Sequence, residues 1–103
     1  MPLLEGKVAI ITGAGRGLGK AFATRYAAEG ASLLLPDISL ERAEAAAREI
    51  RDGGGRAVAM EADISDEKAT QAIADRVIKE YGRVDVLLNN AAIYYGVKGR
   101  PWN

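Results

Sequence analysis

The sequence predicts an α/β fold in which helices flank a parallel β-sheet. Short apolar runs alternate with segments of helical apolar period, in the order β-α-β-α-β-α-β. The connections are short, and the chain has no internal repeat and no low-complexity linker. Because 103 residues suffice for one domain at most, we expect residues 1–103 to form a single unit.

Four runs have the composition of strands buried on both faces of a parallel sheet, because they are short and rich in aliphatic side chains. The expected strands cover residues 8–11, 31–35, 56–62 and 84–88. Pro36 follows the second run and has no N–H to donate, so we expect ladder pairing to end there. Asp37 would then stand just beyond this strand.

Three segments between the strands carry apolar residues at helical spacing. The predicted helices run from the glycine cluster at residues 13–19 to Gly30, from Leu40 to Asp52, and from Ser65 to Gly82. Ser39 and Ser65 are the expected N-terminal caps of the last two, since a serine hydroxyl accepts hydrogen bonds from free N–H groups of a first turn. Leu18 and Leu40 are expected on the buried faces of the first and second helices.

The order of the strands is predicted from the handedness of their connections and from the Rossmann pattern. Right-handed crossovers and this pattern together favour the order 3-2-1-4, with the strands numbered along the chain. The chain then reverses direction between strands one and four, so the glycine loop and the loop at Asn90 flank one crevice at the carboxyl end of the sheet. The sequence therefore predicts a Rossmann-like, doubly wound sheet with three helices and a ligand at this switch point.

The glycine cluster between the first strand and the first helix indicates what that ligand is. A helix N-terminus presents unpaired N–H groups and the positive end of a dipole, which together can hold a diphosphate, so we expect a nucleotide. The commonest dinucleotide spacing does not fit, because Leu18 and Lys20 occupy required glycine positions. A P-loop does not fit either, because its first glycine would fall on Ala14. The alternative to a nucleotide site is a glycine-rich turn that connects the strand to the helix and binds no ligand.

Three motifs, in the expected order, resemble those of the short-chain dehydrogenase/reductase family. Thr12-Gly13-x-x-x-Gly17-x-Gly19 resembles its cofactor-binding motif. Asp63-Ile64 resembles its acidic-aliphatic pair at the adenine, and Asn89-Asn90-Ala91-Ala92 resembles its Asn-Asn-Ala-Gly motif with Ala92 in place of the glycine. The resemblance runs from about Lys7 to Ala92 and covers only the N-terminal part of a family member. Residues 1–103 would then be a truncated NAD(P)-binding Rossmann segment.

The resemblance implies a bound nicotinamide dinucleotide. The candidate contacts to it are Gly13, Gly15, Arg16, Gly17, Leu18, Gly19, Asp37, Asp63, Ile64, Asn90 and Ala91. Asp37 is placed to accept hydrogen bonds from the adenosine ribose and to repel a 2′-phosphate, so we expect NAD rather than NADP. Arg16 favours NADP, because family members that prefer it often carry a basic residue there. The alternatives are a solvated turn at Asp37, an ordinary exposed arginine at position 16, and a helix-capping role for Asp63.

The sequence predicts no catalytic residue in this chain. Tyr94 and Lys98 have the Tyr-x-x-x-Lys spacing of the family's catalytic pair, which requires a helical turn. Gly96 lies between them and Pro101 follows closely, so we interpret the pair as a coincidence in a loop. Cysteine and histidine are both absent from the sequence, and no metal site is expected.

Family members transfer a hydride between a nicotinamide and a carbonyl or secondary alcohol, and usually assemble as homo-oligomers. The resemblance implies that this chain supplies the dinucleotide-binding part and is inactive alone, with a substrate bound only by a full-length form. Fourteen basic residues balance fourteen acidic ones, which gives no electrostatic case for nucleic acid or a membrane surface, and without a signal peptide we expect a cytoplasmic location. The alternatives are a non-catalytic nucleotide-binding module or degenerate fragment and, disfavoured by Asp37 and Asn90, a flavodoxin-like binder.

Overall fold

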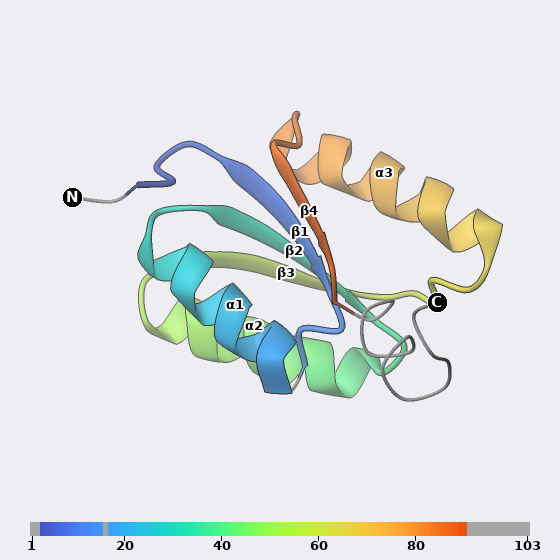
Figure 1. The fold of residues 1–103 in the computed structure, drawn as a ribbon, viewed down its shortest axis with the longest axis horizontal. Helices are drawn as coiled ribbons and strands as arrows, with labels where there is room; N and C mark the ends of the chain where they lie inside the picture. Colours follow the sequence, from blue (N-terminus) through green and yellow to red (C-terminus); the bar gives the residue numbers. More distant parts are fainter. Residues whose placement is uncertain (1–2, 16, 91–103) are drawn as a thin grey trace, which may run out of the picture.

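The computed structural model describes residues 3–15 and 17–90, and these form a four-stranded parallel sheet with three helices (Figure 1). The strands are β1 (Val8–Thr12), β2 (Ser32–Asp37), β3 (Arg56–Glu61) and β4 (Val86–Asn89). The helices are α1 (Gly17–Ala28), α2 (Leu40–Asp52) and α3 (Glu67–Tyr81). The strands lie in the order β3-β2-β1-β4, and all three pairings are parallel, so the predicted Rossmann-like fold class and strand order are confirmed.

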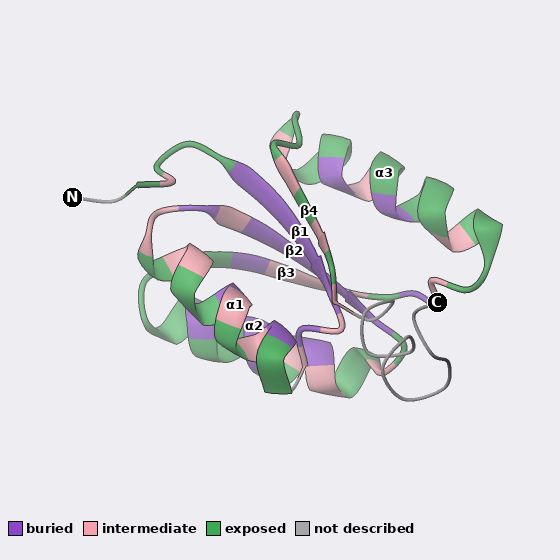
Figure 2. Cartoon of the chain, in the orientation of Figure 1, coloured by how far each residue is buried: buried purple, intermediate pink, exposed green. Residues whose placement is uncertain are grey.

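The helices form one layer on each face of the sheet. Helices α1 and α2 cover one face, and α3 covers the other (Figure 1). Alternate residues of β1 therefore enter different cores: Ala9 and Ile11 join the cluster beneath α1 and α2, whereas Val8 and Ile10 join the cluster beneath α3. Burial on both faces explains why the inner strands are continuous apolar runs (Figure 2).

Strand β2 continues through Pro36, where the sequence predicted its end. Pro36 and Asp37 pair with Met60 and Glu61 of β3. The Pro36 carbonyl accepts a hydrogen bond from the Gly13 N–H at 3.0 Å, toward the β1 side. The N–H and the C=O of a strand residue point toward the same neighbouring strand. The position of the missing Pro36 N–H therefore faces β1, and its absence removes no hydrogen bond between β2 and β3. This correction places Asp37 inside the sheet rather than beyond it.

The helix starts also differ from the prediction in two respects. Ser39 caps α2 as predicted, since its hydroxyl accepts from the Arg42 N–H at 3.2 Å. The cap of α3 is Asp66 rather than Ser65, because the Asp66 carboxylate accepts from the Lys68 N–H at 2.9 Å. Leu18 and Leu40 are 59% and 46% exposed, although both were expected to be buried. They stand at the first turns of α1 and α2, at the carboxyl edge of the sheet, where less of the sheet lies beneath the helix.

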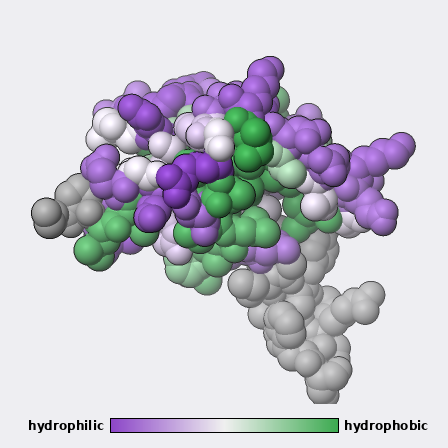
Figure 3. Space-filling view, turned by 90° about the horizontal axis from the view of Figure 1, so that it is seen from above, coloured by the Kyte–Doolittle hydropathy of each residue, from purple (hydrophilic) through white to green (hydrophobic). Residues whose placement is uncertain are grey.

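Strand β4 forms the outer edge beside β1 and begins at Val86, two residues later than predicted. Its Val86 and Leu88 pack against the core beneath α1 and α2, while Leu87 is 65% exposed. Ile78 and Val84 are exposed as well, and Figure 3 shows hydrophobic side chains gathered on the face that is seen from above. Among the described residues, no helix is long and apolar enough to cross a membrane.

Candidate functional site

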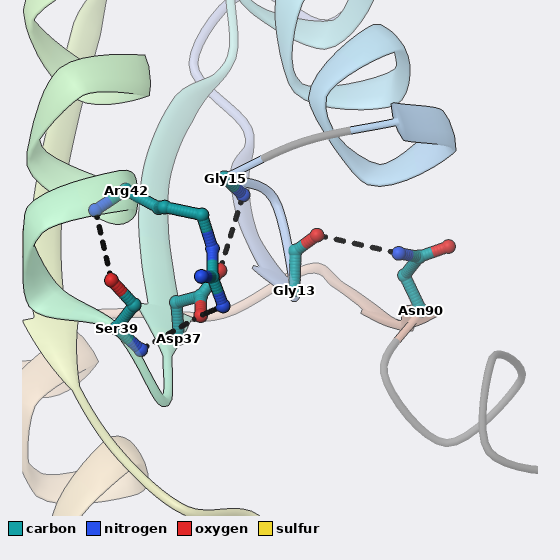
Figure 4. Close-up of polar contacts among 6 residues, drawn as sticks. All are labelled: Gly13, Gly15, Asp37, Ser39, Arg42 and Asn90. Atoms are coloured by element: carbon teal, nitrogen blue, oxygen red, sulfur yellow. Dashed lines mark hydrogen bonds and ion pairs between the residues drawn. The ribbon is translucent and has the colours of Figure 1, made fainter.

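The carboxyl ends of β1 and β4 lie side by side, where the strand order predicts a crevice. Thr12 and Asn89 are partners in the β1–β4 register, and the Thr12 hydroxyl donates to the Asn89 side-chain oxygen at 3.0 Å. One residue further on, the Asn90 Nδ2 donates to the Gly13 carbonyl at 3.4 Å (Figure 4). The loops after the two strands are therefore tied together by side-chain hydrogen bonds at the switch point.

Gly19 lets the first turns of α1 lie directly against this loop. A Cβ at Gly19 would collide with the Gly13 carbonyl oxygen and would stand 2.7 Å from Asn90 Nδ2. No larger residue fits without moving the loop or the asparagine. Gly17 and Leu18, by contrast, are exposed at the start of the helix. The N-terminal turn of α1 is thus exposed beside the ends of β1 and β4, where its free backbone N–H groups could meet a phosphate.

Asp37, at the end of β2, is held in a closely packed arrangement although it is a carboxylate (Figure 4). It is 6% exposed. Its Oδ1 accepts from the Ser39 N–H at 2.9 Å, and its Oδ2 accepts from the Gly15 N–H at 3.3 Å. The guanidinium of Arg42, reaching over from α2, places Nη2 3.5 Å from Oδ1. The glycine loop and α2 therefore hold this carboxylate in place.

Gly15 is as constrained as Gly19, but by the Asp37 side of the site. A Cβ at Gly15 would stand 2.7 Å from the Arg42 Cβ and 2.8 Å from Asp37 Oδ2. Only a glycine lets the loop approach closely enough for its N–H to reach the carboxylate. The two glycines thus have different partners: Gly19 permits contact with Asn90, and Gly15 permits contact with Asp37.

Asp63 and Ile64 follow β3, the strand beside β2, and so lie at the same end of the sheet. The Asp63 carboxylate is exposed, and its Oδ1 accepts from the Ser65 hydroxyl at 2.7 Å and from the Ser65 N–H at 3.0 Å. These two bonds hold the pKa of Asp63 below its ordinary value, the hydroxyl having the larger effect. Ile64 is half-buried and packs against the core beneath α3. Their contact with adenine stays a prediction.

Arg42 is a site residue that the sequence reasoning missed. It stands in the first turn of α2, where the helix dipole favours acidic rather than basic side chains, and this was a signal that a carboxylate lies nearby. Two predicted contacts, Arg16 and Ala91, lie outside the described residues, as does the rejected pair Tyr94 and Lys98. Within residues 3–15 and 17–90, no group of three or more metal-ligating side chains is clustered.

Comparison with known proteins assigns the chain to one family. A model of that family, described as short chain dehydrogenase, matches residues 7–101. The chain belongs to the short chain dehydrogenase family. The resemblance inferred from the three motifs is therefore confirmed.

The short chain dehydrogenase relatives are similar over most of this chain. The 7alpha-hydroxysteroid dehydrogenase of Escherichia coli K12 is 47% identical over 88 residues, which cover 85% of this chain and 34% of the relative. The sorbitol dehydrogenase of Cereibacter sphaeroides is 42% identical over 91 residues, or 88% of this chain and 34% of the relative. The chain thus spans about a third of the length of the curated relatives it matches.

Solved structures of the family agree with the fold. The crystal structure of a hydroxysteroid dehydrogenase from Escherichia coli matches with a TM-score of 0.80 at 45% identity, covering 82% of this chain and 34% of that chain. The citronellol catabolism dehydrogenase of Pseudomonas aeruginosa PAO1 matches with a TM-score of 0.80 at 32% identity, covering 84% of this chain and 36% of that one.

Proposed function

We propose that this chain forms the NAD(H)-binding part of an oxidoreductase acting on a carbonyl or secondary alcohol substrate. The observation that carries the proposal is the Asp37 carboxylate, which is held at the end of β2 by an N–H of the glycine loop. A carboxylate at this position of a doubly wound sheet accepts hydrogen bonds from the adenosine ribose hydroxyls. Its negative charge opposes a 2′-phosphate, which supports NAD over NADP.

The residues at the crevice fit a dinucleotide. The N-terminal turn of α1 would hold the diphosphate on backbone N–H groups, because Gly19 leaves the helix close to the loop. Asn90 would keep the Gly13 carbonyl in place at the nicotinamide side. At the other end, Asp63 and Ile64 would meet the adenine, and Arg16, Gly17, Leu18 and Ala91 complete the proposed contacts.

The bound nicotinamide would supply the hydride chemistry, and the residues of this chain would bind and orient it. Proton transfer would then fall to residues outside this chain, and we assign no catalytic role to Tyr94 or Lys98. We further propose that the full-length protein is cytoplasmic and homo-oligomeric. The full-length form would supply the substrate site. The chain by itself is expected to show no turnover.

Binding of reduced cofactors to the purified chain tests the proposal. Isothermal titration calorimetry with NADH, NADPH and FMN should give saturable binding of NADH, weaker binding of NADPH, and none of FMN. Asp37→Ala should weaken NADH binding about 10- to 100-fold, the equivalent of one charge-assisted hydrogen bond. Glu41→Ala, which removes an exposed carboxylate from the same region, is the matched control and should leave binding unchanged. No binding of either nicotinamide cofactor would overturn the proposal.

A further inference from the structure

Arg42 is the residue of this site whose arrangement the proposed function does not explain. Its stem lies beneath the glycine loop, since its Cβ is the atom nearest to the position a Cβ on Gly15 would take. Its guanidinium reaches across to Asp37, with Nη2 3.5 Å from Oδ1, and 41% of its side chain is exposed (Figure 4). The cation therefore stands beside the carboxylate that is expected to select the adenosine ribose.

The hydrogen bonds of Arg42 are also incomplete. Its Nε is buried and has no hydrogen-bond partner, and the 3.5 Å approach of Nη2 to Asp37 is longer than a good charge-assisted bond. Asp37 does not depend on this arginine alone, because the Gly15 and Ser39 N–H groups also hold it. The buried Nε is out of reach of a ligand, but 41% of the Arg42 side chain is exposed, so the guanidinium can meet an acceptor that binds beside Asp37.

A 2′-phosphate would bring Arg42 a second acceptor beside Asp37. Phosphate oxygens match the planar fork of a guanidinium, and the positive charge offsets the repulsion from Asp37. The ribose hydroxyls of NAD, in contrast, need only the carboxylate. Arg42 therefore affects the two cofactors unequally.

We propose that Arg42 is a specificity-determining residue that weakens the rejection of NADP by Asp37, so that the site admits both cofactors with a preference for NAD. This inference rests on the proposed function. In the absence of Arg42 the carboxylate alone would face the 2′-phosphate, and discrimination against NADP would increase. With Arg42 present, the discrimination is set by a carboxylate and a cation together.

The experiment measures NADH and NADPH dissociation constants for the chain and three variants by calorimetry. Arg42→Gln should weaken NADPH binding about tenfold or more relative to NADH binding, so that the ratio of the two dissociation constants rises. Arg42→Lys, which keeps the charge, should recover part of the NADPH affinity. Arg48→Gln removes an exposed arginine from the same helix and should leave the ratio of the two constants unchanged. Adenosine 2′,5′-bisphosphate and adenosine 5′-monophosphate, titrated in the same way, isolate the contribution of the 2′-phosphate.

The outcomes separate this inference from the proposed function. Equal losses of NADH and NADPH affinity in Arg42→Gln would show a structural role and overturn the inference, as would an unchanged ratio. An equal effect in Arg48→Gln would assign the change to net charge and also overturn it. If the unaltered chain binds neither cofactor, the proposed function itself fails. Thermal melts of each variant exclude unfolding as the cause of a lost signal.

Discussion

The tripeptide Asp-Ile-Ser occurs twice in this chain, at residues 37–39 and 63–65, and the two copies have different surroundings. Asp37 is the last residue of β2, and Asp63 lies just after the neighbouring strand β3. Both carboxylates accept a hydrogen bond from the N–H of the serine two residues later. Asp37 is nevertheless 6% exposed, and its carboxylate is also held by the Gly15 N–H and by Arg42. The Asp63 carboxylate is exposed, and the hydrogen bonds that it accepts within the described residues come from Ser65.

The difference arises from position in the sheet. Asp37 ends β2, an inner strand whose neighbour β1 leads into the glycine loop, and this loop reaches across to the carboxylate. Asp63 follows β3, the outer strand of the order β3-β2-β1-β4, which has a neighbouring strand on one side. A local sequence thus makes the same short turn twice, and the neighbouring strands decide which copy becomes a rigid part of the site.

The two serines differ for a reason closer in sequence. Ser39 is followed by Leu40 and caps α2 through its hydroxyl. Ser65 is followed by Asp66, a competing cap, whose carboxylate accepts from the Lys68 N–H instead. The Ser65 hydroxyl then turns back to Asp63. The isoleucines diverge too, because Ile38 is 59% exposed while Ile64 packs beneath α3.

The contrast between the buried Asp37 and the exposed Asp63 should be affected most by Gly15→Ala, which forces the glycine loop away from Asp37. The added Cβ would stand 2.7 Å from the Arg42 Cβ, so the loop or α2 must shift. We expect a loss of about 1–3 kcal/mol in the free energy of unfolding, measured by urea denaturation, and loss of measurable NADH binding. Gly53→Ala is the control, since its Cβ would meet atoms at 3.6 Å or more. Equal stability of the two variants would contradict the described packing.

Replacing each aspartate by asparagine compares the two carboxylates directly. Asp37→Asn should weaken NADH binding about tenfold or more, because it removes a charged acceptor that is buried and prepositioned. Asp63→Asn should weaken it by no more than about threefold, since an exposed group contributes less. Calorimetry on both variants, with melting curves as the folding control, checks the order. The reverse order would show that the adenine end dominates recognition.

Replacing each serine by alanine tests the caps. Ser39→Ala should lower the free energy of unfolding by about 1 kcal/mol, because the Arg42 N–H loses its partner at the start of α2. Ser65→Ala should change it by less than about 0.5 kcal/mol, since Asp66 caps α3. Urea denaturation of both variants measures the difference. A larger loss for Ser65→Ala would mean that this serine, rather than Asp66, starts the helix.

The smallest expected effect is on the titration of Asp63. Its carboxyl pKa lies below the ordinary value of 3.8 because Ser65 bonds to the ionised form. The stabilisation from this shift is therefore complete above the unfolded-state pKa and is lost as the pH falls through the folded-state pKa. Carboxyl chemical shifts followed by NMR should show the pKa rising toward 3.8 in Ser65→Ala. An unchanged pKa in that variant would argue against the hydrogen bond.

The sequence by itself determined the α/β class, the strand order and the outline of the site. Nearly continuous apolar runs between helical segments sufficed to predict the sheet, because strands buried on both faces are mostly aliphatic. Right-handed crossovers and the Rossmann pattern then favoured the order 3-2-1-4, which places the glycine loop beside Asn90. The family resemblance followed from the spacing of three motifs, and the family match confirmed it.

Only the tertiary structure decided how these parts meet. Pro36 continues β2 because its carbonyl accepts a hydrogen bond from Gly13. The sequence around Pro36 does not reveal this contact, because Gly13 lies in a distant segment of the chain. Leu18 and Leu40 are exposed because their turns lie at the edge of the sheet, although their helical spacing suits burial. Arg42 reaches Asp37 because α2 packs beside the glycine loop. The spacing of apolar residues in the sequence shows which face of a helix or strand is apolar. Whether a given residue is buried or forms an ion pair depends on where the neighbouring helices and strands end in space.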